Sequence, residues 1–130
     1  MIYLAAPYSH EFDSVKEHRY HCVNRIAAIL IAGGEMVFSP ISHSHPIAKC
    51  GIDGDWDTWS EFDLRMIEIC DEMVVLMLDG WRESKGVKAE IERAKYLQMP
   101  IKYFDTSFLF STPQEHAVHA AKAMMEDQPE

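Results

Sequence analysis

The sequence has few cysteines, and they are not arranged in pairs. Its three cysteines are Cys22, Cys50 and Cys70, with no CxxC spacing among the 130 residues. An odd, unpaired set argues against a disulfide framework and against a structural zinc site. We therefore expect reduced thiols, mostly buried, in a soluble cytoplasmic protein.

Long apolar runs are also missing. No stretch approaches the roughly 20 apolar residues that a membrane-spanning helix needs. The apolar segment at residues 2–6 is not preceded by a basic region and ends at Pro7, which differs from a signal peptide. We interpret it as the first strand and expect no membrane partner.

Basic residues are scarce. The chain has 12 Lys and Arg against 21 Asp and Glu, a formal net charge of -9. Binding of a nucleic acid polymer requires clustered positive charge, so we expect no such partner. A small anionic ligand stays possible because one phosphate needs only a few donors. The length suits a single domain, residues 1–130, with one hydrophobic core.

Apolar patterning predicts strands that alternate with helices. Short, nearly continuous apolar runs are typical of strands buried on both faces, and they occur at residues 2–5, 36–38, 73–78 and 101–104. Helical spacing predicts helices over residues 14–31, from Asp55 or Asp57 through Ile69, 87–97 and about 113–125. Residues 41–54 lack periodicity and are predicted to be an irregular loop.

Capping residues support these boundaries. Asp13 and Ser14 are expected to cap the first helix, and Gly33-Gly34 is expected to end it. The second helix is predicted to present Trp59, Phe62, Met66 and Ile69.

The alternation predicts an α/β protein: a flavodoxin-like, Rossmann-type three-layer sandwich with a mostly parallel sheet of four to five strands. Its core would be residues 1–104. In such sheets, ligands bind outside the carboxyl ends of the strands. This rule selects three loops for a ligand site, at residues 6–13, 39–54 and 79–86.

The third of these loops leads into a helix. Ser84 and Gly86 leave backbone N–H groups near the helix N-terminus, where the helix dipole favours an anion. Glu90 lies about one turn into that helix and could reach a sugar held by the loop. Judged on spacing alone, Glu90 would more often be a solvated helix residue.

Several residues in order resemble a known enzyme group. Tyr3, Asp63 and the element Ser84-x-Gly86-Val87-x-x-Glu90, followed by Ala94 and Pro100, resemble the nucleoside 2-deoxyribosyltransferase superfamily over roughly residues 1–104. That group includes deoxyribosyltransferases and deoxynucleoside 5′-monophosphate N-glycosidases. The segments at residues 2–10, 42–46 and 79–81 look closer still to a bacterial and phage branch, DUF1937-like.

The resemblance implies a role for three residues. Glu90 would be the nucleophile that attacks the anomeric carbon, Tyr3 would orient it, and Asp63 would protonate the departing base. The implied activity is cleavage or exchange of an N-glycosidic bond, by hydrolysis or by transfer. It also implies a homodimer or homotetramer, and we expect no cofactor.

The same resemblance and the loop rule nominate substrate-binding residues. They are Ala6, Pro7, Ser9, Arg19, His43, His45, Trp59, Asp79, Ser84, Gly86 and Val87. Ser84 stands where transferases acting on free nucleosides tend to carry Asp, and a serine at a helix N-terminus can donate to phosphate. Ser84 therefore favours a nucleoside 5′-monophosphate over a nucleoside.

Two other functions stay open. His43, His45 and Cys50, with His10, could hold zinc in a metallohydrolase, although their spacing matches no standard closed site and we expect no metal. The same fold could also bind or sense a nucleotide without cleaving it.

Overall fold

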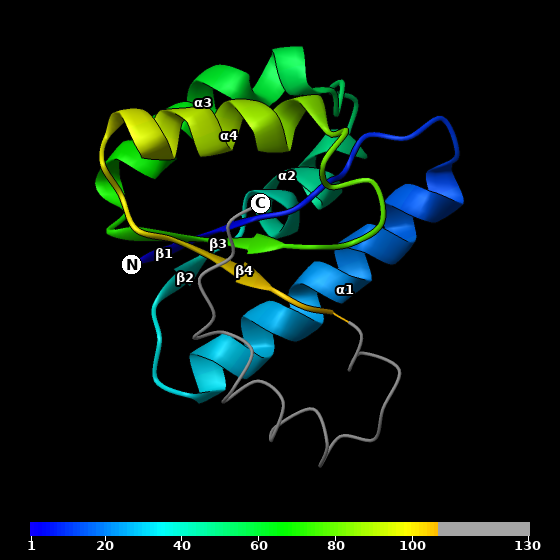
Figure 1. Ribbon diagram of the computed structural model, residues 1–130. Helices are drawn as coiled ribbons and strands as arrows, with labels where there is room; N and C mark the ends of the chain where they lie inside the picture. The colour runs from blue at the N-terminus through cyan, green and yellow to red at the C-terminus, as the bar shows by residue number, and fades with distance from the viewer. Residues whose placement is uncertain (107–130) are drawn as a thin grey trace.

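Four short apolar strands form the centre of the molecule. The structure, a computed structural model, describes residues 1–106, and within them the strands are β1 (Ile2–Ala5), β2 (Val37–Phe38), β3 (Glu72–Leu76) and β4 (Ile101–Phe104). They pair in the order β2-β1-β3-β4, and every pair is parallel (Figure 1). The predicted α/β fold is confirmed, and the order agrees with the start of a flavodoxin-like sheet.

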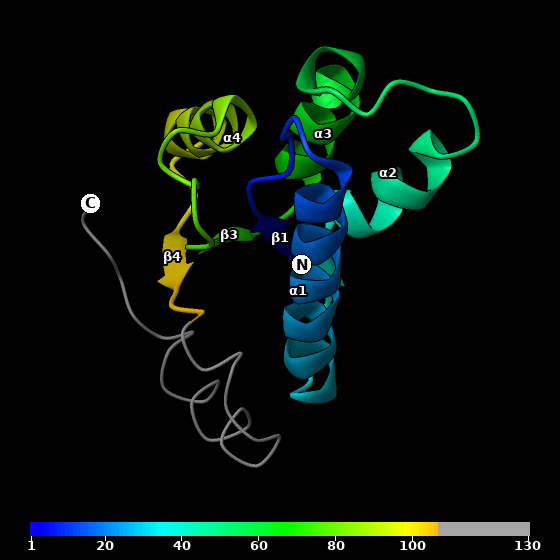
Figure 2. The same ribbon diagram turned by 90° about the vertical axis from the view of Figure 1, so that its right-hand side faces the viewer.

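The helices cover both faces of this sheet. Helix α1 (Asp13–Ala32) lies on one face, while α3 (Trp56–Ile69) and α4 (Lys85–Tyr96) lie side by side on the other (Figures 1 and 2). The short helix α2 (Pro40–Ala48) contacts α1 and β1. The described residues therefore form the three layers that the sequence predicted.

Alternate residues of β1 enter two separate cores. Ile2 and Leu4 pack in the cluster beneath α1, whereas Tyr3 and Ala5 pack in the cluster beneath α3 and α4. This follows from the period of two along a strand. Tyr3 is fully buried, on the face of β1 that α3 and α4 cover.

The ends of α1 agree with the prediction in part. The expected cap at Asp13 and Ser14 is wrong: the N-cap is Phe12, which makes no side-chain cap hydrogen bond, and Asp13 lies in the first turn. The carbonyl of Phe12 accepts the Val15 N–H instead. The helix ends where the glycines predicted it, because Gly34 has a φ of 100°, which only glycine adopts readily.

The loop predicted at residues 41–54 is wrong over its first half, which is helix α2. The Ser39 side chain accepts the Ser42 N–H, and Pro40 occupies the first helical turn, so the residues before the segment start a helix. The helix was missed because its polar residues and Pro46 hide the apolar spacing. Residues 49–55 do form the connection to α3.

Helix α3 begins at the predicted cap but presents another face. The Asp55 carboxylate accepts the Thr58 N–H. The buried side chains are Asp63 and Ile67, whereas Phe62 and Ile69 are exposed. The predicted apolar face is therefore rotated by part of a turn from the face that is buried. The buried face places the Asp63 carboxyl group in the interior.

The remaining predictions agree closely with the structure. Strand β3 starts and ends slightly earlier than expected, and α4 starts two residues earlier. Cys22 and Cys70 are buried, while Cys50 is exposed. The helix predicted at residues 113–125 lies outside the described residues. Within residues 1–106, no helix combines the length and the apolar character needed to cross a membrane.

Candidate active site

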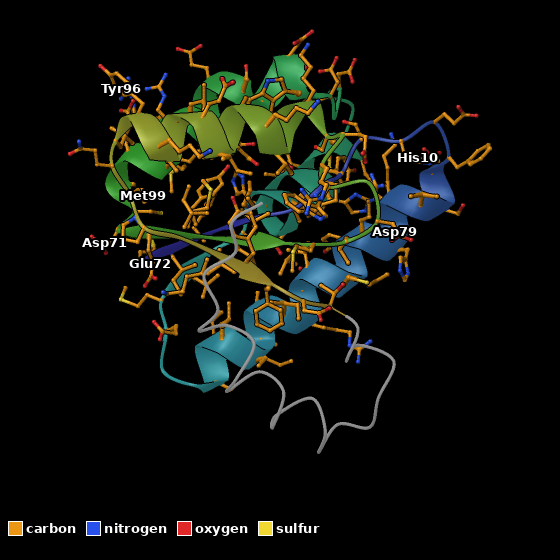
Figure 3. The ribbon with its side chains drawn as sticks, in the orientation of Figure 1. His10, Asp71, Glu72, Asp79, Tyr96 and Met99 are labelled. Carbon is orange, nitrogen blue, oxygen red and sulfur yellow. The ribbon has the colours of Figure 1, made fainter. Side chains whose placement is uncertain are left out.

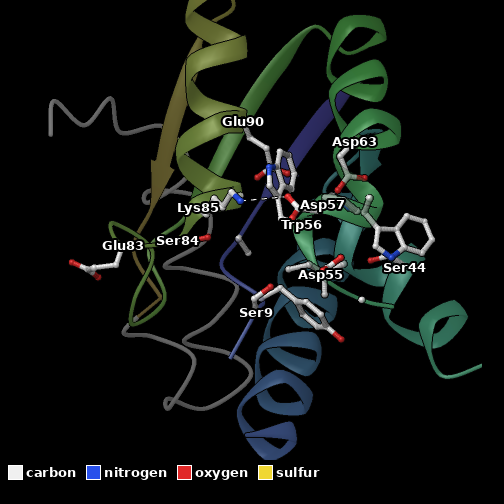
Figure 4. Close-up of a pocket in the computed structure, with 17 residues that line it drawn as sticks. Ser9, Ser44, Asp55, Trp56, Asp57, Asp63, Glu83, Ser84, Lys85 and Glu90 are labelled. Carbon is white, nitrogen blue, oxygen red and sulfur yellow. Dashed lines mark hydrogen bonds and ion pairs between the residues drawn. The ribbon is translucent and has the colours of Figure 1, made fainter. Parts of the chain in front are cut away.

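A pocket lies at the carboxyl ends of β1 and β3. Its volume is about 320 Å³, within the range of small-molecule sites. Strand β1 has β2 on one side and β3 on the other, so the pocket occupies the point where the strand order reverses. All three predicted loops supply lining residues (Figure 4), which are Ala6, Tyr8, Ser9, Pro40, Ile41, Ser44, Gly54, Asp55, Trp56, Asp57, Trp59, Asp63, Glu83, Ser84, Lys85, Gly86 and Glu90.

Glu90 is buried in this pocket and has one defined partner. Its carboxylate oxygen Oε2 accepts a hydrogen bond from the Tyr3 hydroxyl at 2.6 Å, although the two residues are 87 positions apart. Burial raises the pKa of Glu90 from 4.5 to about 8, and the nearby Asp63 adds to the rise, while the Tyr3 hydrogen bond opposes it. Burial also raises the pKa of Tyr3, so its hydroxyl keeps its hydrogen.

Asp63 enters the same pocket from α3. Figure 4 shows Asp63 and Glu90 on neighbouring helices, with both carboxyl groups at the pocket. Asp63 is buried, and its Oδ1 atom has no hydrogen-bond partner among the described residues. Burial raises the pKa of Asp63 from 3.8 to about 7. An unsatisfied buried carboxyl oxygen is costly, and it points to a group that a ligand satisfies.

The N-terminus of α4 forms another part of the wall. The Ser84 hydroxyl oxygen accepts the Val87 N–H at 3.2 Å, so Ser84 is the N-cap of the helix. Val87 is fully buried in the core and does not line the pocket. Trp56 packs on the same turn, because a Cβ atom at Gly86 would lie 3.2 Å from its ring.

Arg19 joins two of the loops. Its Nη1 donates to the Ser9 carbonyl at 3.1 Å, and its Nη2 donates to the Asp79 carbonyl at 2.9 Å. The Asp79 side chain is exposed, at the end of the sheet where His10 also lies (Figure 3). Neither Arg19 nor Asp79 lines the pocket. Both residues were predicted to bind substrate, and in the structure their contact holds the loops after β1 and β3 together.

This junction makes Gly80 sensitive to substitution. Gly80 has a φ of 88°, and a Cβ atom there would lie 2.9 Å from Arg19 Nη2. Gly51 is the matched control, because its φ is 112° but an added Cβ meets open space. We expect Gly51→Ala to lower the free energy of unfolding by about 1 kcal/mol through backbone strain alone.

Gly80→Ala should lower the free energy of unfolding by about 1 kcal/mol more than Gly51→Ala does, because the Arg19 hydrogen bonds are disturbed as well. Urea denaturation of both variants measures the difference. Equal losses would contradict a structural role for the contact between Gly80 and Arg19.

The predicted histidines contact other side chains. His45 is buried in hydrogen-bonding distance of Tyr8 and Glu17, while His43 stacks on Phe62 with ring centroids 5.1 Å apart. Neither lines the pocket. The His43, His45 and Cys50 set does not assemble, and residues 1–106 contain no group of three His, Cys, Asp or Glu side chains placed to hold a metal.

The structure thus gathers part of the predicted site. Ala6, Ser9, Trp59, Ser84 and Gly86 line the pocket together with Asp63 and Glu90, and Tyr3 reaches Glu90 from beneath. Pro7 is buried outside the lining.

Sequence reasoning missed several residues of the wall. They include Tyr8, Ser44, Asp55, Asp57 and Glu83. The cap at Asp55 could have located one of them, since the start of α3 borders the pocket.

Comparison with known proteins adds one relationship. No functionally curated protein matches this sequence. The model of a family described as a domain of unknown function, DUF1937, matches residues 1–106, which covers every strand and helix described above and the whole pocket. The chain therefore belongs to the DUF1937 family.

Proposed function

We propose that the protein cleaves or exchanges the N-glycosidic bond of a nucleoside or nucleoside 5′-monophosphate, with Glu90 as a covalent nucleophile. One observation carries the proposal: a buried carboxylate, held by the Tyr3 hydroxyl at 2.6 Å, shares a pocket with a second buried carboxyl group whose Oδ1 atom has no hydrogen-bond partner among the described residues. Two carboxyl groups in one pocket provide the nucleophile and the acid that glycosyl transfer needs.

In the first step, an ionised Glu90 oxygen forms a bond to C1′ of the sugar. The bond from C1′ to the base nitrogen breaks, and its electron pair goes to the base. Asp63 donates its proton to the base, which leaves as a neutral molecule. Tyr3 is a positioning residue in this step, because its hydroxyl fixes the carboxylate without touching the sugar.

In the second step, water or another base attacks C1′ and displaces Glu90. The ionised Asp63 accepts the proton that the attacking group loses, so both carboxyl groups return to their first state. Hydrolysis and transfer differ only in this acceptor.

The direct test is base release from a panel of ribo- and deoxyribonucleosides and their 5′-monophosphates, followed by HPLC. We expect free base from at least one substrate, and a second free base in the mixture distinguishes transfer from hydrolysis. A covalent sugar adduct on the Glu90 peptide, trapped with a 2′-fluoro-arabinosyl substrate and detected by mass spectrometry, is the second readout. Ligand binding without base release from any substrate would contradict the proposal and favour a nucleotide-binding module.

Tyr3→Phe should change the pH profile in a specific way. The active form has Glu90 ionised and Asp63 protonated. Because Glu90 has the higher pKa, a single proton shared by the pair resides mostly on Glu90, and the active form is the minor one. The profile of kcat/KM should rise to about pH 7 and fall above about pH 8. Loss of the Tyr3 hydrogen bond raises the pKa of Glu90 further. The maximum of kcat/KM should therefore fall about tenfold, and the alkaline limb should move to higher pH.

Tyr96→Phe is the matched control for this profile, because Tyr96 is exposed near the end of α4. It should leave both limbs unchanged. A Tyr3→Phe profile that keeps the wild-type maximum and limbs would show that the hydrogen bond does not act on the reacting carboxylate.

A further inference from the structure

Tyr8 lines the pocket at the end of a chain of hydrogen-bonded side chains that the proposed reaction does not use. Its hydroxyl lies 2.5 Å from His45 Nδ1, and His45 Nε2 lies 3.0 Å from the Glu17 carboxylate. His45 is only 5% exposed and stacks on the Tyr20 ring with centroids 4.2 Å apart. Residues from α1 and α2 therefore fix the orientation of a tyrosine that belongs to the loop after β1.

The chemistry of this chain sets the direction of its hydrogen bonds. A carboxylate only accepts, so the Nε2 atom facing Glu17 carries a hydrogen. In the neutral imidazole, Nδ1 is then an acceptor, and it takes the hydrogen of the Tyr8 hydroxyl. The Tyr8 oxygen keeps lone pairs beyond this bond, so to a ligand in the pocket that Tyr8 lines it can act as an acceptor rather than a donor.

The pocket wall around Tyr8 is acidic. Of the residues that line it, one carries an ammonium group and five carry carboxyl groups, which are Asp55, Asp57, Asp63, Glu83 and Glu90. Figure 4 labels these residues. Lys85 is the ammonium group, and its Nζ lies 3.3 Å from Asp57. Arg19 does not line the pocket, and its guanidinium donates to the Ser9 and Asp79 carbonyls. Such a wall favours a ligand that donates hydrogen bonds and disfavours one that adds negative charge.

Building on the proposed function, we propose that Tyr8 selects an unphosphorylated nucleoside by accepting a hydrogen bond from its 5′-hydroxyl. A 5′-phosphate removes that hydroxyl hydrogen and brings about two negative charges to the acidic wall. This preference is the reverse of the one that Ser84 suggested from the sequence. The Ser84 oxygen accepts the Val87 N–H as the helix cap, and this contact leaves the Ser84 hydroxyl hydrogen able to serve either substrate.

The test compares matched substrates that share one base and one sugar. We expect wild-type kcat/KM to be at least about tenfold higher for the nucleoside than for its 5′-monophosphate. Tyr8→Phe should lower kcat/KM about tenfold for the nucleoside but less than about twofold for the 5′-deoxynucleoside, which lacks the hydroxyl. Tyr96→Phe is the control for loss of a phenol, and thermal unfolding of each variant checks that it folds.

Three results would overturn the inference. A wild-type preference for the monophosphate would refute it and leave the proposed function standing. Equal effects of Tyr8→Phe on the nucleoside and the 5′-deoxynucleoside would show that Tyr8 only supports the structure. If no substrate releases base, the proposed function fails; calorimetric titration of the wild type with the same nucleoside and monophosphate then decides, and tighter binding of the monophosphate would refute the selection by Tyr8.

Discussion

Glu90→Gln should reduce base release by a factor on the order of 10⁴ or more, because an amide cannot form the bond to C1′ that the reaction needs. The substitution changes one atom and keeps an oxygen that can accept from the Tyr3 hydroxyl, so the pocket should keep its shape and still bind substrate. The measurement is single-turnover base release, with mass spectrometry of the Glu90 peptide for the covalent adduct.

The matched control is Glu92→Gln, two residues along the same helix and exposed. It changes the same chemical group but should leave kcat/KM within about twofold of the wild-type value, because substitutions at exposed positions away from a site usually have small effects. Base release that persists in Glu90→Gln at a rate near that of Glu92→Gln would refute the assignment of the nucleophile.

Glu90→Gln should also make the protein more stable at pH 8. In the unfolded chain Glu90 titrates near 4.5, and in the folded protein burial raises its pKa to about 8. Between these values the folded state binds more protons, so a rise in pH favours unfolding. A shift of this size corresponds to about 5 kcal/mol as an upper limit, and Asp63, raised to about 7, acts in the same direction.

We expect the wild-type free energy of unfolding to fall steadily from pH 5 to pH 8 and then to level off. Glu90→Gln should flatten this slope and gain about 2–3 kcal/mol at pH 8, or roughly 10 °C in Tm. At pH 5, where the folded wild type holds a neutral Glu90, the two proteins should have similar stability.

Between pH 5 and 8, the difference in stability between the wild type and Glu90→Gln isolates the contribution of Glu90, because Asp63 titrates in both proteins. The pKa values of Glu17 and Asp55 are lowered by their hydrogen bonds, so the stability that they contribute is lost only at more acidic pH. The N-terminal amine titrates above 8, since Asp71 raises its pKa. Thermal unfolding across the interval, with Glu92→Gln as the control, measures the slope. A wild-type stability that is constant or rises over the interval would refute a buried, neutral Glu90.

The sequence predicted the sheet well because each strand is a simple local signal. Residues 2–5 and 73–76 are apolar on both faces, and only a central parallel strand buries both. Gly34 marked the end of α1 for a similarly local reason, since its left-handed backbone excludes most side chains. Helix α2 escaped prediction because a nine-residue helix with two histidines and an internal proline has no apolar period to read.

The site was less accessible to sequence reasoning. The contact between Tyr3 and Glu90 joins residues 87 positions apart, and the resemblance rather than the spacing brought them together. The burial of Asp63 depends on how α3 is rotated about its axis. The apolar residues Phe62 and Ile69 predicted a different rotation, because both are exposed in the structure. Tyr8 was not singled out because its partner His45 lies on the helix that was missed.

The two hydrogen bonds of Arg19 have a consequence for redesign of the pocket. Both end on main-chain oxygens, so their formation does not depend on which side chains stand at positions 9 and 79. A library that varies position 9, which lines the pocket, can therefore sample new specificities on an unchanged frame. The same freedom does not extend to position 19, where only a planar, forked cation reaches both carbonyls at once.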